Sequence, residues 1–125
     1  MENPIVARIE QSRKERSQLH PRFLANAAAY RPFLEVEKHA FAQGSLSRKH
    51  KELIALAISI VTKCEPCMEW HTEQALKAGA VEAEFFETID VAIEMGGGPA
   101  AAYARFALQA FDYYTMRSGE CTEST

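Results

Sequence analysis

Two cysteines and a histidine lie close together near the middle of the chain. Cys64 and Cys67 are separated by two residues, and His71 follows Cys67 by four positions. In a helix, Cys67 and His71 at this spacing share one face, and the two thiols lie within one turn. Such thiols can form a disulfide, and the imidazole beside them can accept a proton or join them as a metal ligand. The segment is therefore suited to thiol chemistry or to metal binding.

The position of the cysteines favours the thiol chemistry. A cysteine reacts as its thiolate, and an ordinary thiol is mostly protonated at neutral pH. The N-terminus of a helix and a neighbouring imidazole both favour the thiolate. Pro66 suits the first turn of a helix, so the cysteines are expected at a helix start. We predict Cys67 as the nucleophile and Cys64 as the thiol that resolves it by forming a disulfide.

A carboxylate upstream is a candidate partner for the histidine. Glu52 precedes the most apolar run of the chain, residues 53–61, and is expected to be partly buried. A carboxylate in that position can orient His71 or take up a proton through it, as in other relays of nucleophile, base and orienting group. This hypothesis requires that the two side chains meet in space. The alternative is an ordinary solvated charge on a helix.

Zinc binding is an alternative for the same segment. Cys64, Cys67 and His71 are all common zinc ligands, and the candidates for a fourth ligand are Glu52, His50 and His39. Structural zinc sites usually draw on two short ligand pairs, however, and the chain has no second pair of cysteines or histidines. A further alternative is that the CxxC pair has no role. Cys121, near the polar C-terminus, is expected to be an incidental thiol.

Composition narrows the function classes. The chain has 125 residues, of which 47% are hydrophobic, enough for one compact domain. A formal net charge of −3 gives no basic surface for nucleic acid or an anionic membrane. No apolar run reaches the roughly 20 residues of a membrane-spanning helix, and the N-terminus does not resemble a signal peptide. We expect a soluble, cytoplasmic protein without a cofactor or metal.

The apolar spacing predicts helices throughout, because no segment alternates with a period of two. The β-branched residues 58–61 allow a strand, but the helix-formers that precede them favour a helix. We predict an all-α domain over residues 1–117, with a core at about 30–115 and a polar, flexible tail at 118–125. The expected helices begin at Pro4 and break at His20–Pro21, then span 23–30, 32–41, 49–62 with Ser47 as N-cap, 66–77, 82–95 and 100–116.

The four candidate residues also resemble a known signature. Glu52, then Cys64 and Cys67, then His71 are spaced as in the alkylhydroperoxidase D (AhpD) branch of the carboxymuconolactone decarboxylase-like family. The flanking segments 46–57 and 71–80 are similar to that family as well. The resemblance covers roughly residues 30–115 and implies an AhpD-like fold of about six helices. It also implies a homo-oligomer, either a dimer, a trimer or a hexamer.

The resemblance implies a reaction too. By analogy, Cys67 attacks a small-molecule hydroperoxide, Cys64 resolves the product, and Glu52 with His71 relays protons. The reductant in that family can be a thiol or a lipoyl-bearing protein. One departure is Pro66, since the best-known peroxidases of the branch have a histidine directly before the second cysteine. The lactone decarboxylases of the wider family are an alternative, but they lack the paired thiols.

Overall fold

The computed structural model describes the backbone of residues 3–123 and the side chains of residues 3–117. Within these residues the chain is helical without a strand, which confirms the all-α prediction. The side chains of the expected polar tail, Cys121 among them, lie outside the described residues. The helices are α1 (Pro4–Asn26), α2 (Tyr30–Phe41), α3 (Arg48–Val61), α4 (Glu65–Lys77) and α5 (Glu82–Glu123). None of the helices in the described part is both long and apolar enough to cross a membrane.

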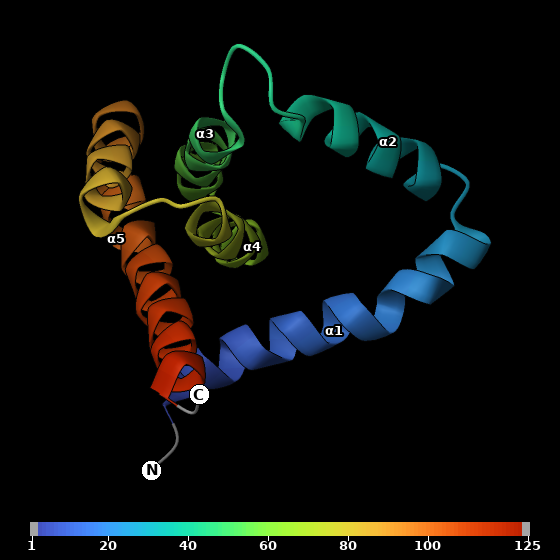
Figure 1. Cartoon of the computed structure of the whole chain (residues 1–125), viewed down its shortest axis with the longest axis horizontal. Coiled ribbons are helices and arrows are strands. Elements are labelled where there is room, and N and C mark those ends of the chain that lie inside the picture. Colours follow the sequence, from blue (N-terminus) through green and yellow to red (C-terminus); the bar gives the residue numbers. More distant parts are fainter. Residues whose placement is uncertain (1–2, 124–125) are drawn as a thin grey trace.

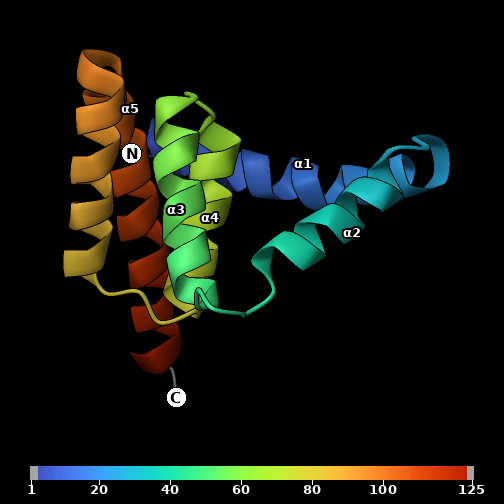
Figure 2. The same cartoon turned by 90° about the horizontal axis from the view of Figure 1, so that it is seen from above.

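The helices α3, α4 and α5 form the body of the molecule (Figures 1 and 2). α5 is interrupted at Gly97, whose φ of 70° and ψ of −153° are not helical, so the expected end of one helix and start of the next at the glycine run is confirmed. The chain turns back there, and the two halves of α5 lie side by side (Figure 2). Phe85 and Phe111, one on each half, pack with ring centroids 4.6 Å apart.

α3 crosses this body as a helix, as the sequence predicted. Ser47 caps its N-terminus by accepting a hydrogen bond from the backbone N–H of His50. Leu56 and Ile60, four positions apart, are fully buried against α5, whereas Ile58 between them is exposed. This period of four, rather than two, is the pattern of a helix with one buried face.

The N-terminal helices form an arm that leaves the body at one end and returns to it at the other (Figure 1). The predicted break at His20–Pro21 is wrong, because α1 continues through Pro21 to Asn26. Proline removes the helical hydrogen bond to the carbonyl four residues earlier, and here that residue, Ser17, is exposed, so water can solvate the freed carbonyl. The chain bends instead at residues 27–29, and Pro32 lies in the first turn of α2, where it is tolerated.

Candidate active site

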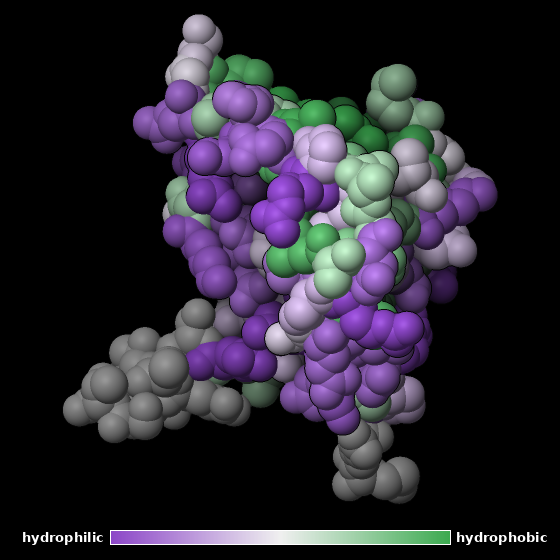
Figure 3. Space-filling model, turned by 90° about the vertical axis from the view of Figure 1, so that its right-hand side faces the viewer, coloured by the Kyte–Doolittle hydropathy of each residue, from purple (hydrophilic) through white to green (hydrophobic). Residues whose placement is uncertain are grey.

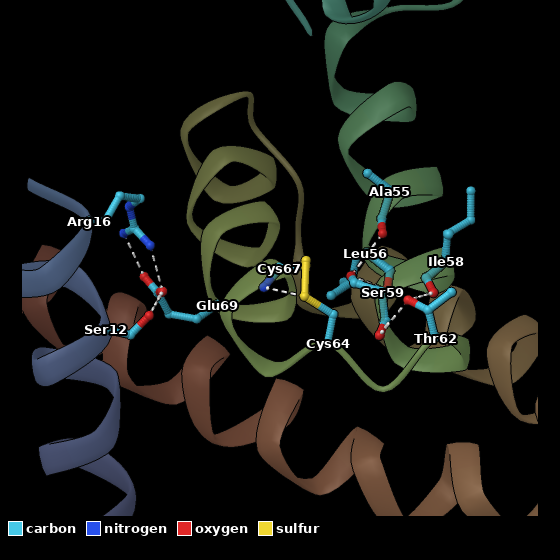
Figure 4. The surroundings of a disulfide bond; sticks show 10 residues. All are labelled: Ser12, Arg16, Ala55, Leu56, Ile58, Ser59, Thr62, Cys64, Cys67 and Glu69. Atoms are coloured by element: carbon cyan, nitrogen blue, oxygen red, sulfur yellow. Dashed lines mark hydrogen bonds and ion pairs between the residues drawn. A yellow bond between two sulfur atoms is a disulfide. The ribbon is translucent and has the colours of Figure 1, made fainter. Parts of the chain in front are cut away.

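The two cysteines lie at the start of α4, as predicted. Lys63 has a φ of 61°, which turns the chain sharply from α3 into α4. Cys64 is the N-cap of α4, and its sulfur accepts a hydrogen bond of 3.2 Å from the backbone N–H of Cys67 (Figure 4). The two residues are joined by a disulfide, with Cα atoms 5.2 Å apart. Both cysteines are half-buried, so the turn and the cap hold the two sulfur atoms within bonding distance while leaving them partly accessible.

Glu52 and His71 meet, as the relay hypothesis requires. Glu52 on α3 is only 2% exposed, and its Oε1 lies 2.8 Å from Nδ1 of His71 on α4. An ionised carboxylate accepts this hydrogen bond, so Nδ1 carries the proton and Nε2 keeps a free lone pair. Phe41 from α2 stacks on the imidazole with ring centroids 5.4 Å apart. The ring is therefore fixed on two sides, and Cys67 lies one helical turn before it on α4.

A pocket of about 370 Å³ opens at this pair, between α2, α3 and α4. Its wall combines aromatic side chains with charged ones from all three helices. The two cysteines are not among its lining residues; His71, one turn along α4, connects the pocket with them. The lining residues are Glu37, Lys38, Phe41, Ala42, Arg48, Glu52, Trp70 and His71.

A buried ion pair lies beside this site and was not predicted. Glu69, between the cysteines and His71 in sequence, is fully buried. Arg16 of α1 binds both of its carboxylate oxygens, at 2.8 and 2.9 Å, and Ser12 donates a further hydrogen bond (Figure 4). Tyr114 of α5 donates another. Glu69 thus fastens α1 and α5 to the helix that carries the cysteines.

The electrostatics of this cluster favour the charged arginines and the neutral tyrosine. The hydrogen bonds to Glu69 raise the pKa of Arg16 above its ordinary value, against a smaller effect of burial. Burial opposes the charge of Arg13, but hydrogen bonds to Tyr114 and Glu73, at 2.7 and 3.0 Å, outweigh it and raise its pKa. Burial, and then the hydrogen bond to Glu69, raise the pKa of Tyr114.

A signal for this cluster was present in the sequence. Arg13 and Arg16 are spaced for one face of α1, and Glu69 and Glu73 are spaced for one face of α4. Two helices that each carry a pair of like charges about one turn apart, of opposite sign on the two helices, can pair along these faces. Arg16 also lies over the ring of Trp70, with its guanidinium carbon 4.8 Å from the ring centroid. The ion pair therefore reaches one wall of the pocket.

The candidate zinc ligands form no metal-binding group among the described residues. Over residues 3–117, no group of three or more His, Cys, Asp or Glu side chains is arranged to hold a metal ion. His39 pairs with Glu35 on the exposed side of α2. His50 is hydrogen-bonded to the hydroxyl of Ser47, and His71 is hydrogen-bonded to Glu52.

Comparison with known proteins agrees with the fold. The sequence profile of the carboxymuconolactone decarboxylase family matches residues 27–110. The chain belongs to this family. An uncharacterized protein from Cupriavidus necator is 44% identical over 88 residues, which cover 70% of this chain and 78% of that protein.

Two solved structures extend the comparison to three dimensions. A carboxymuconolactone decarboxylase family protein from Legionella pneumophila, in its apo form, superposes with a TM-score of 0.81 at 30% identity, covering 86% of this chain and 96% of that one. A family member from Thermotoga maritima superposes with a TM-score of 0.79 at 25% identity, covering 92% and 97%. Involvement in an antioxidative response has been suggested for the Thermotoga protein. Within the family, the Cys64–Cys67 pair fits the AhpD type.

Proposed function

We propose that this member of the carboxymuconolactone decarboxylase family is a thiol-dependent peroxidase of the AhpD type. The observation that carries the proposal is the Cys64–Cys67 disulfide, one helical turn from an imidazole that is held by a buried carboxylate. A disulfide between two half-buried cysteines at a helix start is the oxidised product that such a cycle leaves behind. The antioxidative response suggested for the Thermotoga relative supports the same chemistry.

The cycle begins with the reduced pair. His71 accepts the proton of Cys67 at Nε2, and Glu52 stabilises the imidazolium that results. The Cys67 thiolate attacks the terminal oxygen of the hydroperoxide, so an S–O bond forms and the O–O bond breaks. The leaving alkoxide takes the proton from His71 and departs as an alcohol. Cys67 is then a sulfenic acid, and the hydroperoxide has gained two electrons.

Cys64 completes the oxidative half. Its thiolate attacks the sulfur of the Cys67 sulfenic acid, the S–S bond forms, and the hydroxyl leaves as water after it takes up a proton. The Cα separation of 5.2 Å shows that α4 accommodates this bond. An external dithiol, such as a lipoyl-bearing protein, returns two electrons and two protons by thiol–disulfide exchange.

A thiol titration under anaerobic conditions tests the proposal. Fully reduced protein is treated with one equivalent of cumene hydroperoxide, and thiols and intact mass are measured before and after. We expect two of the three thiols to disappear, the mass to fall by two hydrogen atoms, and one equivalent of cumyl alcohol to form. Unchanged thiols after this treatment, with the peroxide intact, would overturn the proposed function.

Serine variants separate the roles of the two thiols. In a Cys121→Ser background, Cys67→Ser is expected to abolish the reaction with hydroperoxide. Cys64→Ser is expected to react once and stop at a sulfenic acid that dimedone traps on Cys67, because no neighbouring thiol remains to condense with it. An adduct on Cys64 in the Cys67→Ser protein, with none on Cys67 in the converse variant, would reverse the assignment.

A further inference from the structure

The first turn of α3 has an unusual set of charges. It contains no acidic residue and consists of Arg48, Lys49, His50 and Lys51. Cations at the N-terminus of a helix are unfavourable, because they lie beside the positive end of the helix dipole. Helix stability therefore does not explain these residues, and their partners elsewhere in the fold do. Lys49 pairs with Glu84 of α5 at 2.8 Å, whereas Arg48 reaches the proton relay.

Arg48 lies beside the oxygen of Glu52 that does not bind His71. Oε1 of Glu52 accepts the hydrogen bond from Nδ1 of His71. Oε2 lies 3.7 Å from Nε of Arg48, which is four positions earlier on the same face of α3. A guanidinium group stays protonated in proteins. The carboxylate thus has an imidazole at one oxygen and a permanent cation beside the other.

A hydrogen bond to α4 holds the guanidinium in this position. Nη2 of Arg48 donates to Oε1 of Gln74 over 3.2 Å. Gln74 is only 8% exposed and follows His71 by three positions, about one turn along α4. One planar group therefore contacts the carboxylate of α3 through Nε and the amide of α4 through Nη2. Arg48 connects the two helices at the relay.

Solvent reaches Arg48 but hardly reaches Glu52. The side chain of Arg48 is 54% exposed, whereas that of Glu52 is 3% exposed. Figure 3 views the molecule from the side of the arm and shows that hydrophilic side chains make up most of this face. Water and salt weaken ion pairs between such surface groups. The carboxylate of Glu52 is removed from water instead, and burial penalises its charged form unless a cation is near.

The other charged side chains at the pocket do not replace Arg48. Glu37 and Lys38 line the pocket from α2 and have opposite charges, and the lining residues include none from α5. Among the side chains of residues 3–117, the ion pairs of Glu52 are those with Arg48 and His71. While the imidazole is neutral, Arg48 is thus the cation that balances the charge of Glu52.

We propose that Arg48 is a positioning residue of the relay, which keeps Glu52 ionised and directed at His71 while the imidazole is neutral. Glu52 can then stabilise the imidazolium that forms when His71 takes the proton of Cys67. Arg48 acts through Glu52 and not on the reacting atoms. Its effect on peroxide reduction rests on the proposed function, whereas its effect on the Cys67 thiolate does not.

Loss of Arg48 should move the reactivity of Cys67 to higher pH. In Arg48→Gln the buried carboxylate of Glu52 takes up a proton more readily, so the imidazolium loses its counter-ion. The thiolate that the imidazolium stabilises then forms only at higher pH. The pH profile of alkylation by iodoacetamide measures this shift without peroxide, in a Cys64→Ser, Cys121→Ser background where Cys67 is the one remaining cysteine. We expect the midpoint to rise by about half a pH unit or more.

A control and a double variant show through which group Arg48 acts. Lys49→Gln removes a neighbouring cation and its ion pair with Glu84, away from the relay, and should keep the parent midpoint. In a Glu52→Gln background there is no carboxylate to keep ionised, so Arg48→Gln should cause only a small part of the shift. Equal shifts in both backgrounds, or no shift in Arg48→Gln, would overturn the inference. Far-ultraviolet circular dichroism checks that each variant keeps its helices.

Oxidation by cumene hydroperoxide separates this inference from the proposed function. At pH 6 we expect the fully reduced Arg48→Gln protein to oxidise about threefold or more slowly than wild type, and at pH 9 we expect the difference to shrink, because Cys67 is then ionised in both. An equal loss at both pH values would indicate a structural role and overturn the inference. The alkylation shift, with no peroxide reaction even in wild type, would support the role of Arg48 and refute the proposed function.

Discussion

The hydrogen bond between Glu52 and His71 decides which nitrogen of the imidazole is available for chemistry. Because Nδ1 is held by the carboxylate, Nε2 is the atom that can accept a proton. Phe41 prevents the ring from tilting out of this orientation. The arrangement gives the base a fixed tautomer and a fixed direction, which is what a proton relay needs.

Glu52→Gln is the sharpest test of this role. The amide keeps the size of the side chain but carries no charge to stabilise the imidazolium. We expect thiol oxidation by hydroperoxide to slow roughly 100-fold at neutral pH. The matched control is Glu87→Gln on the exposed side of α5, which should oxidise at the wild-type rate. A purely structural carboxylate would instead show an unchanged oxidation rate with a lowered melting temperature, so thermal melts are measured beside the kinetics.

The raised pKa of Tyr114 predicts a loss of stability in alkali. The ordinary pKa of tyrosine is 10.0, and burial with the hydrogen bond to Glu69 raises it in the folded protein. Below pH 10 the hydroxyl is protonated in both states. Above pH 10 the unfolded chain releases this proton while the folded protein retains it, so the free energy of unfolding falls as the pH rises. Urea unfolding at several pH values from 8 to 11 should show a shallower fall for Tyr114→Phe than for wild type, and equal slopes would contradict the assignment.

Residue spacing predicted the thiol pair and the histidine because helix geometry alone relates their positions on α4. Glu52 lies on another helix, so its pairing with His71 was a hypothesis supported only by the resemblance to a known signature. The partners of Glu69 were not predicted, since Arg16 and Tyr114 lie on other helices and their pairing depends on tertiary packing. The role of Phe41 as the support of His71 was missed for the same reason.

At the scale of helices, α5 depends on one unusual backbone conformation. Gly97 has φ and ψ values that side-chain-bearing residues rarely adopt. The reversal at this residue brings Phe85 against Phe111 and so closes the core of the body. One residue thereby determines whether the two halves of α5 pack on each other.

Gly97→Ala should destabilise the protein, whereas Gly98→Ala should not. A Cβ at either position would meet no atom within 4 Å, so sterics do not distinguish the two variants. Of these two glycines, only Gly97 has a positive φ, which alanine rarely adopts. We therefore expect Gly97→Ala to lower the free energy of unfolding by about 1–3 kcal/mol. Gly98→Ala should be neutral or raise it by up to about 1 kcal/mol, because alanine restricts the unfolded chain. Urea denaturation of both variants measures the difference, and equal losses would contradict the argument.

Local sequence signals predicted the body well and the arm less well. Ser47, the apolar run of α3 and the glycine run each act over a few residues, and the structure has the corresponding cap, helix and break. Pro21 was interpreted by the same local rule, yet α1 continues through it. Because the helix is continuous, His20 and Phe23 lie on one face of α1, on either side of Pro21, and both contact Tyr30 of α2.

At the scale of the whole molecule, assembly links stability to concentration. We expect a homo-oligomer from the family resemblance, so unfolding should also separate its chains. We expect the melting temperature to fall by roughly 4 °C for each tenfold dilution, because dilution favours the separated, unfolded chains. Differential scanning fluorimetry from 0.1 to 100 µM tests this. A melting temperature independent of concentration in wild type would show that unfolding does not involve dissociation.

The polar contacts between α1 and the body determine when α1 can dock during synthesis of the chain. α1 leaves the ribosome before the helices that it binds, because Arg16 pairs with Glu69, 53 positions later, and Arg13 with Tyr114, 101 positions later. The helices α3, α4 and α5 pack on neighbours in sequence, and such local contacts form early in folding. At about 5–20 residues per second of synthesis, α1 waits roughly 5–20 seconds for the last of these partners to be translated. α1 therefore docks after α3, α4 and α5 have packed, although it is synthesised before them, and its two arginines are open to solvent and to chaperones in the meantime.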